Sequence, residues 1–165
     1  MQLDLKRFFS DEAEESLPFD YTMDLSDTEV SGVRPFVSPV RVKGRVDNCA
    51  GAAVLTAEVA FDFSMPCDRC AEMVTKRRQE TFSHQILLSE EESEDDRYLR
   101  VSGTELDLDE LVREDILLSL PTRFLCSAEC KGLCPVCGQN LNFGNCECRS
   151  VQVDPRLEIL KQWMD

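Results

Sequence analysis

The sequence predicts an α+β fold: a mainly antiparallel β-sheet or partly closed barrel with one covering helix, followed by a C-terminal cysteine-rich zinc module and a terminal helix. Three observations predict it. Apolar and polar side chains alternate along several runs within residues 1–105, as they do in strands with one buried face. Apolar residues then recur at helical spacing in residues 108–120. Six of the nine cysteines lie within residues 126–148.

Length and composition favour one main domain with a small appended module. The chain has 165 residues, and its 42% hydrophobic content is ordinary for a globular protein. We expect an α+β domain in residues 1–121, with an acidic loop at residues 89–96, and a zinc-binding tail with the C-terminal helix in residues 122–165. The formal net charge of −14 argues against a non-specific nucleic-acid binder but allows a local basic face.

The sequence predicts a cytoplasmic protein with no membrane association. Its first residues contain an early acid, Asp4, and no long apolar run, so we expect no signal peptide. No stretch approaches the roughly 18 apolar residues of a membrane helix. Thiols stay reduced in the cytosol, and nine cysteines is an odd count, so metal ligation is favoured over disulfides.

The first half of the chain is predicted to form strands. Leu3 and Leu5 alternate with polar residues, and residues 19–25 contain a second alternating run. Residues 36–64 are predicted to form a hairpin that turns at residues 48–51. In its first strand the valines share one side, and the other side carries basic side chains, namely Arg41, Lys43 and Arg45.

A second group of basic residues, Lys76, Arg77 and Arg78, lies near the start of the strand predicted for residues 73–88. One interpretation is a solvated strand face that protects a sheet edge. The other is a phosphate-contacting face, formed together with Arg41, Lys43 and Arg45 if the strands that carry the two groups are neighbours. These six residues are the candidate nucleic-acid contacts.

One helix is predicted before the tail and one after it. Asp107 has the position of an N-cap, with Glu110 three residues later, and Pro121 ends the helix. Its acidic residues fit the solvated face of an amphipathic helix better than a pair of catalytic carboxylates. Asp154 followed by Pro155 predicts the start of the terminal helix, which packs on the zinc module or the sheet, or docks a partner.

Eight cysteines form four close pairs, and four thiolates make one tetrahedral zinc site. The pairs are Cys67 with Cys70, Cys126 with Cys130, Cys134 with Cys137, and Cys146 with Cys148. The preferred arrangement places the last two pairs on one ion, because that loop can close locally, and the first two pairs on another. A swapped pairing or a single zinc ion stays open. All-thiolate zinc would be structural, because it leaves no open position for water.

Other chemistries fit the residues less well. The cysteine spacing does not match ferredoxin patterns. Cys67 and Cys70 could form a redox pair, but that motif favours a helix start, and a strand is predicted to follow. The one histidine, His84, fits a filled strand position better than a catalytic role. We therefore predict no enzyme and no small-molecule substrate.

Five segments together give the chain a clear family resemblance. They are Ser38-Pro-Val-Arg-Val-Lys-Gly44, Cys67-Asp-Arg-Cys70, Glu114-Asp-Ile-Leu-Leu-Ser-Leu-Pro121, Cys130-Lys-Gly-Leu-Cys-Pro-Val-Cys-Gly-Gln-Asn-Leu-Asn142 and Asp154-Pro-Arg-Leu157. The chain resembles the YceD family over nearly its whole length. The resemblance implies a role in accumulation of the large-subunit (23S) ribosomal RNA, through its synthesis, processing or stability. It implies no catalytic residues, and the cysteines carry over as metal ligands.

Two partners are compatible with that role. A basic strand face could bind ribosomal RNA, whereas an acidic protein could bind a basic large-subunit ribosomal protein. The alternative class is an enzyme, either a thiol redox protein or an RNA-processing enzyme that uses the cysteine-rich sites. Turnover by the purified protein would distinguish it from a binding protein.

Overall fold

The structure is a computed structural model, and it describes residues 1–6, 16–49, 52–88, 98–101, 103 and 105–148. The predicted acidic loop and the predicted C-terminal helix lie outside these residues. The chain divides into two compact units. The sheet unit comprises Met1–Met65 and Thr75–Thr122, and the cysteine-rich unit comprises Pro66–Val74 and Arg123–Asp165.

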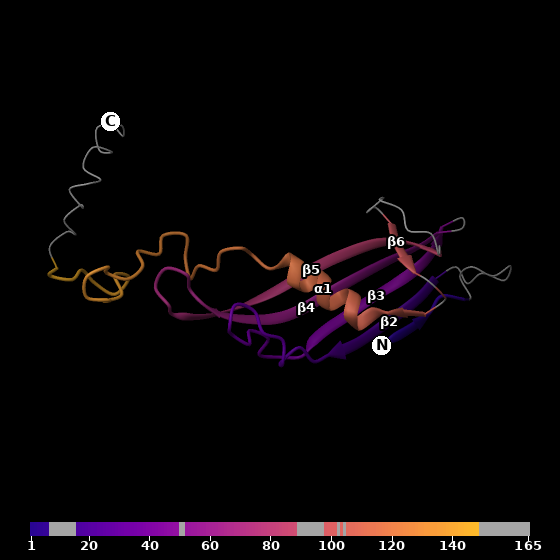
Figure 1. Cartoon of the computed structure of the whole chain (residues 1–165), viewed down its shortest axis with the longest axis horizontal. Helices are drawn as coiled ribbons and strands as arrows, with labels where there is room; N and C mark the ends of the chain where they lie inside the picture. Colours follow the sequence, from indigo (N-terminus) through magenta and orange to yellow (C-terminus); the bar gives the residue numbers. More distant parts are fainter. Residues whose placement is uncertain (7–15, 50–51, 89–97, 102, 104, 149–165) are drawn as a thin grey trace, which may run out of the picture. The chain divides into compact units, whose positions relative to one another are not determined.

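A five-stranded sheet forms most of the sheet unit, and it curls like half of a barrel (Figure 1). Its strands, in spatial order, are β2 (Ser16–Met23), β3 (Val40–Cys49), β4 (Ala52–Pro66), β5 (Met73–Leu88) and β6 (Tyr98–Val101). β3 pairs antiparallel with both β2 and β4, as the alternating runs and the hairpin predicted. β6 differs, because it runs parallel to β5.

The β3–β4 hairpin supplies much of the buried core. Val40, Val42 and Val46 are fully buried, whereas the basic side chains between them are exposed, as the alternation predicted. Gly44 lies on the buried side of β3, opposite Phe19 of β2. A Cβ atom added there would lie 2.6 Å from the Phe19 ring and 2.1 Å from the carbonyl oxygen of Thr56. The hairpin therefore has no room for a side chain at Gly44.

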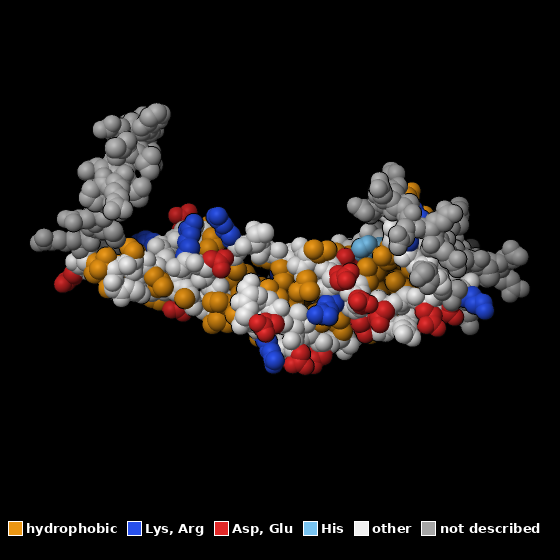
Figure 2. Space-filling view, viewed as in Figure 1, with side chains coloured by type: hydrophobic (Ala, Val, Ile, Leu, Met, Phe, Trp, Pro, Cys, Tyr) orange, Lys and Arg blue, Asp and Glu red, His pale blue; other side chains and the backbone are white. Residues whose placement is uncertain are grey.

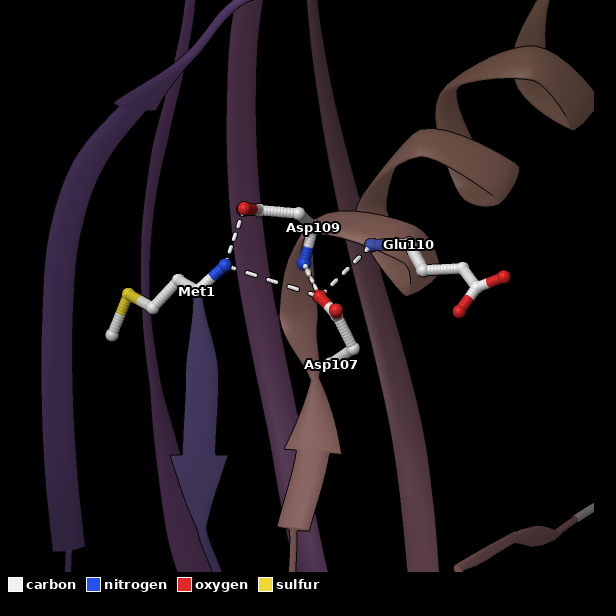
Figure 3. Close-up of polar contacts among 4 residues, drawn as sticks. All are labelled: Met1, Asp107, Asp109 and Glu110. Carbon is white, nitrogen blue, oxygen red and sulfur yellow. Dashed lines mark hydrogen bonds and ion pairs between the residues drawn. The ribbon is translucent and has the colours of Figure 1, made fainter.

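A two-stranded sheet leads into the helix. β1 (Gln2–Asp4) pairs antiparallel with β7 (Glu105–Asp107), and α1 (Leu108–Ser119) follows directly. Asp107 is the N-cap, as predicted: its Oδ1 accepts from the N–H groups of Asp109, at 3.0 Å, and Glu110, at 3.4 Å. Figure 3 shows the amino group of Met1 between the carboxylates of Asp107 and Asp109, which it contacts.

The helix lies over the five-stranded sheet, and one side chain pair ties the two together (Figure 1). The apolar side of α1 is buried through Leu108, Leu111, Val112 and Ile116. Glu110 and Glu114 are exposed, as predicted for the solvated face. Asp115 differs, because its Oδ2 lies 2.7 Å from Nε2 of His84 on β5. With a helix of 12 residues, the described chain contains no helix long and apolar enough to cross a membrane.

The His84–Asp115 pair predicts a pH-dependent stability. Hydrogen bonding to the Asp115 carboxylate raises the pKa of His84 against the opposing effect of burial. The pair's contribution is thus fully present below the unfolded pKa of about 6.5, and it is lost as pH rises through the higher folded pKa. We expect His84→Gln to lower the free energy of unfolding by about 1 kcal/mol at acidic pH and by much less at alkaline pH.

Urea unfolding of both proteins across this pH range measures the effect. Gln85→Ala, at the exposed neighbouring position, is the control and should show no pH-dependent difference from the wild type. An equal loss at every pH for His84→Gln would show that protonation of the imidazole does not contribute.

Candidate metal centre

The first cysteine pair lies in the turn between β4 and β5. The N–H of Ala71 donates to the carbonyl oxygen of Cys67 at 2.9 Å, which closes the turn, and Ala71 has a positive φ of 60°. Asp68, inside the turn, makes two bonds to Phe124: its carboxylate accepts the Phe124 N–H at 2.7 Å, and its own N–H donates to the Phe124 carbonyl at 2.9 Å. These bonds hold the chain that enters Cys126 beside the turn.

The inner cluster consists of Cys67, Cys70, Cys126 and Cys130. Their sulfur atoms all lie within 4.8 Å of one another, with Cys67 Sγ 3.8 Å from Cys130 Sγ and Cys70 Sγ 3.7 Å from Cys126 Sγ. Four sulfurs placed tetrahedrally at the usual Zn–S distance of about 2.3 Å stand about 3.8 Å apart. Cys126 is half-buried and the other three are buried. The inner cluster therefore has the spacing of four ligands to one ion in a largely buried site.

The outer cluster consists of Cys134, Cys137, Cys146 and Cys148, and its sulfur atoms also lie within 4.8 Å of one another. Cys134 is buried, whereas Cys137 and Cys148 are exposed. The turn after Cys134 is closed by the Gly138 N–H, which donates to the Cys134 carbonyl at 2.9 Å. Gly138 has a φ of +74°, a conformation that favours glycine. The grouping into inner and outer clusters is the one preferred from the sequence.

Backbone amides stabilise thiolates in both clusters. The N–H of Cys126, with those of Arg69 and Cys70, lowers the pKa of Cys67 to about 6. The N–H groups of Cys137 and Val136 lower the pKa of Cys134 to about 6, and the Val136 nitrogen lies 3.4 Å from the Cys134 sulfur. A hydrogen bond to a thiolate stabilises the charged form over the neutral thiol. Cys67 and Cys134 are therefore suited to bind a metal ion as thiolates.

The remaining thiols in each cluster cannot all ionise without a cation. The neighbouring Cys130 thiol and burial raise the pKa of Cys126 to about 12. The contact with Cys137 and burial raise the pKa of Cys148 to about 12. Like charges in close contact disfavour one another, and a bound cation removes that cost. Each cluster could therefore hold one metal ion.

Two further residues support the inner cluster, and sequence reasoning missed both. The Arg69 guanidinium donates to the carbonyl oxygen of Cys130 at 2.9 Å. The Asn142 amide donates to the Cys130 sulfur at 3.3 Å. Arg69 stands between Cys67 and Cys70, and Asn142 ends the most specific segment of the family resemblance. The sequence places both residues close to the cysteines. Their contacts with Cys130, however, depend on how the chain folds back on itself.

The six candidate nucleic-acid contacts do not form one basic face. The interpretation as one phosphate-contacting face required the two strands to be neighbours, but β4 lies between β3 and β5. On β5, Ile86 is buried and His84 contacts α1. Side chains alternate along a strand, so the even-numbered side chains of β5 point to the core side. Lys76 and Arg78 share that side by alternation. On β3 the basic side chains point away from the buried valines, so of the β5 residues only Arg77 can share their face.

Acidic partners also interrupt the basic residues. Arg41 pairs with Asp20 at 3.0 Å, Arg45 with Asp47 at 2.8 Å and Arg78 with Glu80 at 2.6 Å. Lys43 stands directly opposite Glu58 of β4. Figure 2, viewed from the side of α1, shows that basic and acidic side chains are also interspersed on that side of the molecule. These neighbouring carboxylates reduce the attraction of the basic side chains for phosphate.

Comparison with known proteins settles the family. Residues 55–163 match the family model described as "Large ribosomal RNA subunit accumulation protein YceD". The protein belongs to the YceD family. The matched residues include the eight cysteines of both clusters, and the resemblance noted from sequence motifs is confirmed.

The relatives that match the chain include proteins from two bacterial groups. The uncharacterized protein YlbN of Bacillus subtilis (strain 168) is 32% identical over 90% of this chain and 88% of its own length. The uncharacterized proteins Rv2926c of Mycobacterium tuberculosis (strain ATCC 25618 / H37Rv) and Mb2951c of Mycobacterium bovis are each 32% identical over 68% of this chain and 56% of their own lengths. No solved structure matches the chain significantly.

Proposed function

We propose that this protein is a non-enzymatic factor that supports 23S ribosomal RNA synthesis, processing or stability, and so accumulation of the large ribosomal subunit. The observation that carries the proposal is the family match over residues 55–163. The two cysteine clusters support a binding role, because a site with four thiolate ligands has no position for a substrate or an activated water. The protein acts in the cytoplasm, where bacterial ribosomes are assembled.

The ions in the clusters are zinc, one in each, and their role is structural. Sulfur–sulfur distances of 3.7 and 3.8 Å suit four ligands around a single tetrahedral ion. An iron–sulfur cluster would place several iron and sulfide ions between the cysteine sulfurs, which would then stand further apart. Zinc would supply folding free energy to this unit, whose described residues include few buried apolar side chains besides the cysteines.

A basic large-subunit ribosomal protein is the direct partner that the charges favour. The chain carries a formal net charge of −14, and the basic side chains of β3 lie next to Asp20, Asp47 and Glu58. An acidic surface attracts a basic protein and repels the phosphate backbone. Ribosomal RNA is the second candidate, supported by the exposed positions of Arg41, Lys43 and Arg45.

A sucrose-gradient profile with a tagged copy of the protein tests this proposal. We expect the tag to travel with large-subunit precursors, and depletion of the protein to lower 23S relative to small-subunit RNA. Crosslinking then identifies the partner: a protein crosslink should survive a triple variant in which Arg41, Lys43 and Arg45 become glutamine, whereas an RNA crosslink should not. A tag that stays at the top of the gradient, with unchanged subunit ratios after depletion, would overturn the proposal.

One observation favours the enzyme alternative. A thiol with a pKa of about 6, such as that of Cys67, is largely ionised at neutral pH, as reactive cysteines are. Cys67 is only 3% exposed, however, so a disulfide substrate has little access to its sulfur. Turnover of disulfide substrates or ribosomal RNA precursors by the purified protein would favour this alternative.

A further inference from the structure

The Asn142 side chain connects the two cysteine clusters. Its Nδ2 donates to Cys130 Sγ at 3.3 Å and to Asn140 Oδ1 at 2.8 Å, and its Oδ1 accepts the Lys131 N–H at 2.8 Å. Both amide hydrogens and the carbonyl oxygen therefore have partners. Two of these three bonds reach the backbone or side chain of the segment that carries an inner-cluster ligand.

Asn142 itself belongs to the loop that the outer cluster closes. It lies between Cys137 and Cys146, both outer-cluster cysteines. The start of this loop pairs with the chain just before it: the Cys134 N–H donates to the Gln139 carbonyl at 2.8 Å, and the Leu141 N–H donates to the Gly132 carbonyl at 2.9 Å. An ion on the outer cluster would fix both ends of the loop, and with them the position of Asn142.

We propose that Asn142 is a positioning residue that couples metal binding at the two clusters, an inference that rests on the proposed metal sites. An ion in the outer cluster holds the loop so that the Asn142 amide donates to Cys130 and raises the metal affinity of the inner cluster. The coupling is reciprocal, because an ion that fixes Cys130 fixes the acceptor of that bond and favours the closed loop.

The physical basis is the hydrogen bond to sulfur. An N–H group directed at a metal-bound thiolate offsets part of its negative charge and fixes its orientation. Loss of such a supporting contact typically lowers metal affinity about 10- to 100-fold. The two clusters differ in exposure, and this difference sets the order in which they lose their ions. Two outer-cluster cysteines are exposed, so the outer ion exchanges first, and its loss weakens the inner site.

A double-mutant cycle on the full chain tests the coupling. Asn142→Asp keeps the oxygen that accepts from Lys131 and removes the donor to Cys130. Cys137→Ser combined with Cys148→Ser disables the outer cluster. The affinity of the inner cluster for Co²⁺ is measured in each variant, and in their combination, from the thiolate-to-cobalt charge-transfer absorption. Asn145→Asp, an exposed change of the same charge in the same loop, is the matched control.

We expect Asn142→Asp and the outer-cluster variant each to weaken Co²⁺ binding at the inner cluster about 10- to 100-fold, with little further loss when they are combined. Asn145→Asp should leave that affinity unchanged. Additive losses, or an unchanged affinity in Asn142→Asp, would each overturn the coupling. A wild-type chain that binds no metal at all would instead overturn the proposed metal sites.

Discussion

Replacing Cys130 with serine is expected to unfold the cysteine-rich unit and leave the sheet unit folded. Cys130 is buried, its sulfur lies 3.8 Å from that of Cys67, and it accepts the Asn142 amide. Structural zinc contributes on the order of 10–16 kcal/mol of apparent binding free energy in small domains, and losing one of four ligands removes a large part of it. Among the residues of this unit that the structure describes, few other buried side chains are available to compensate.

Limited proteolysis with mass-spectrometric mapping of the cleavage sites measures this effect. Cleavage should increase sharply within residues 123–148 and stay unchanged within the strands of the sheet unit. Cys148→Ser is the matched comparison, because Cys148 is an exposed ligand of the outer cluster, and its loss should open only the end of this region. Protection of residues 123–148 in Cys130→Ser equal to that of the wild type would show that the inner cluster does not hold the unit together.

Gly44→Ala is expected to destabilise the sheet unit by about 3 kcal/mol or more. The added Cβ would lie 2.1 Å from the Thr56 carbonyl oxygen, which is backbone of the neighbouring strand, and 2.6 Å from the Phe19 ring. Neither can move without disturbing the pairing of β2, β3 and β4. The cost therefore comes from steric overlap in a packed core, although alanine is only one methyl group larger.

Urea unfolding of the sheet unit, followed by far-ultraviolet circular dichroism, measures the loss as a lower midpoint. Lys43→Ala, at the exposed adjacent position, is the control and should change stability by no more than about 0.5 kcal/mol. If Gly44→Ala and Lys43→Ala unfold at the same urea midpoint, the hairpin can accommodate a methyl group at position 44, contrary to this prediction.

Local patterns predicted the elements well because their causes are local. Alternation identified the strands and the buried face of β3, and the Asp107 cap and Pro121 bounded α1 closely. Pair spacing also led to the observed grouping of the cysteines, since close pairs and short loops restrict which sulfurs can meet. In each case the determining residues lie within one turn, one strand or one short loop.

Features that depend on the order of strands were not predictable in this way. Alternation gives the faces of a strand but does not identify its neighbours, so β4 between β3 and β5 and the parallel pairing of β6 came from the structure alone. The same reason applies to the His84–Asp115 pair and to the contact between Asn142 and Cys130. Each joins residues whose proximity is set by the completed fold.

Native mass spectrometry of the purified full chain tests the central claim, that two four-thiolate zinc sites hold the cysteine-rich unit. We expect a mass that corresponds to two zinc ions per chain at neutral pH. Both ions should be lost on acidification, because the thiolate ligands are then protonated. A metal-free mass, or one that corresponds to iron and sulfide, would show that the two clusters are not zinc sites.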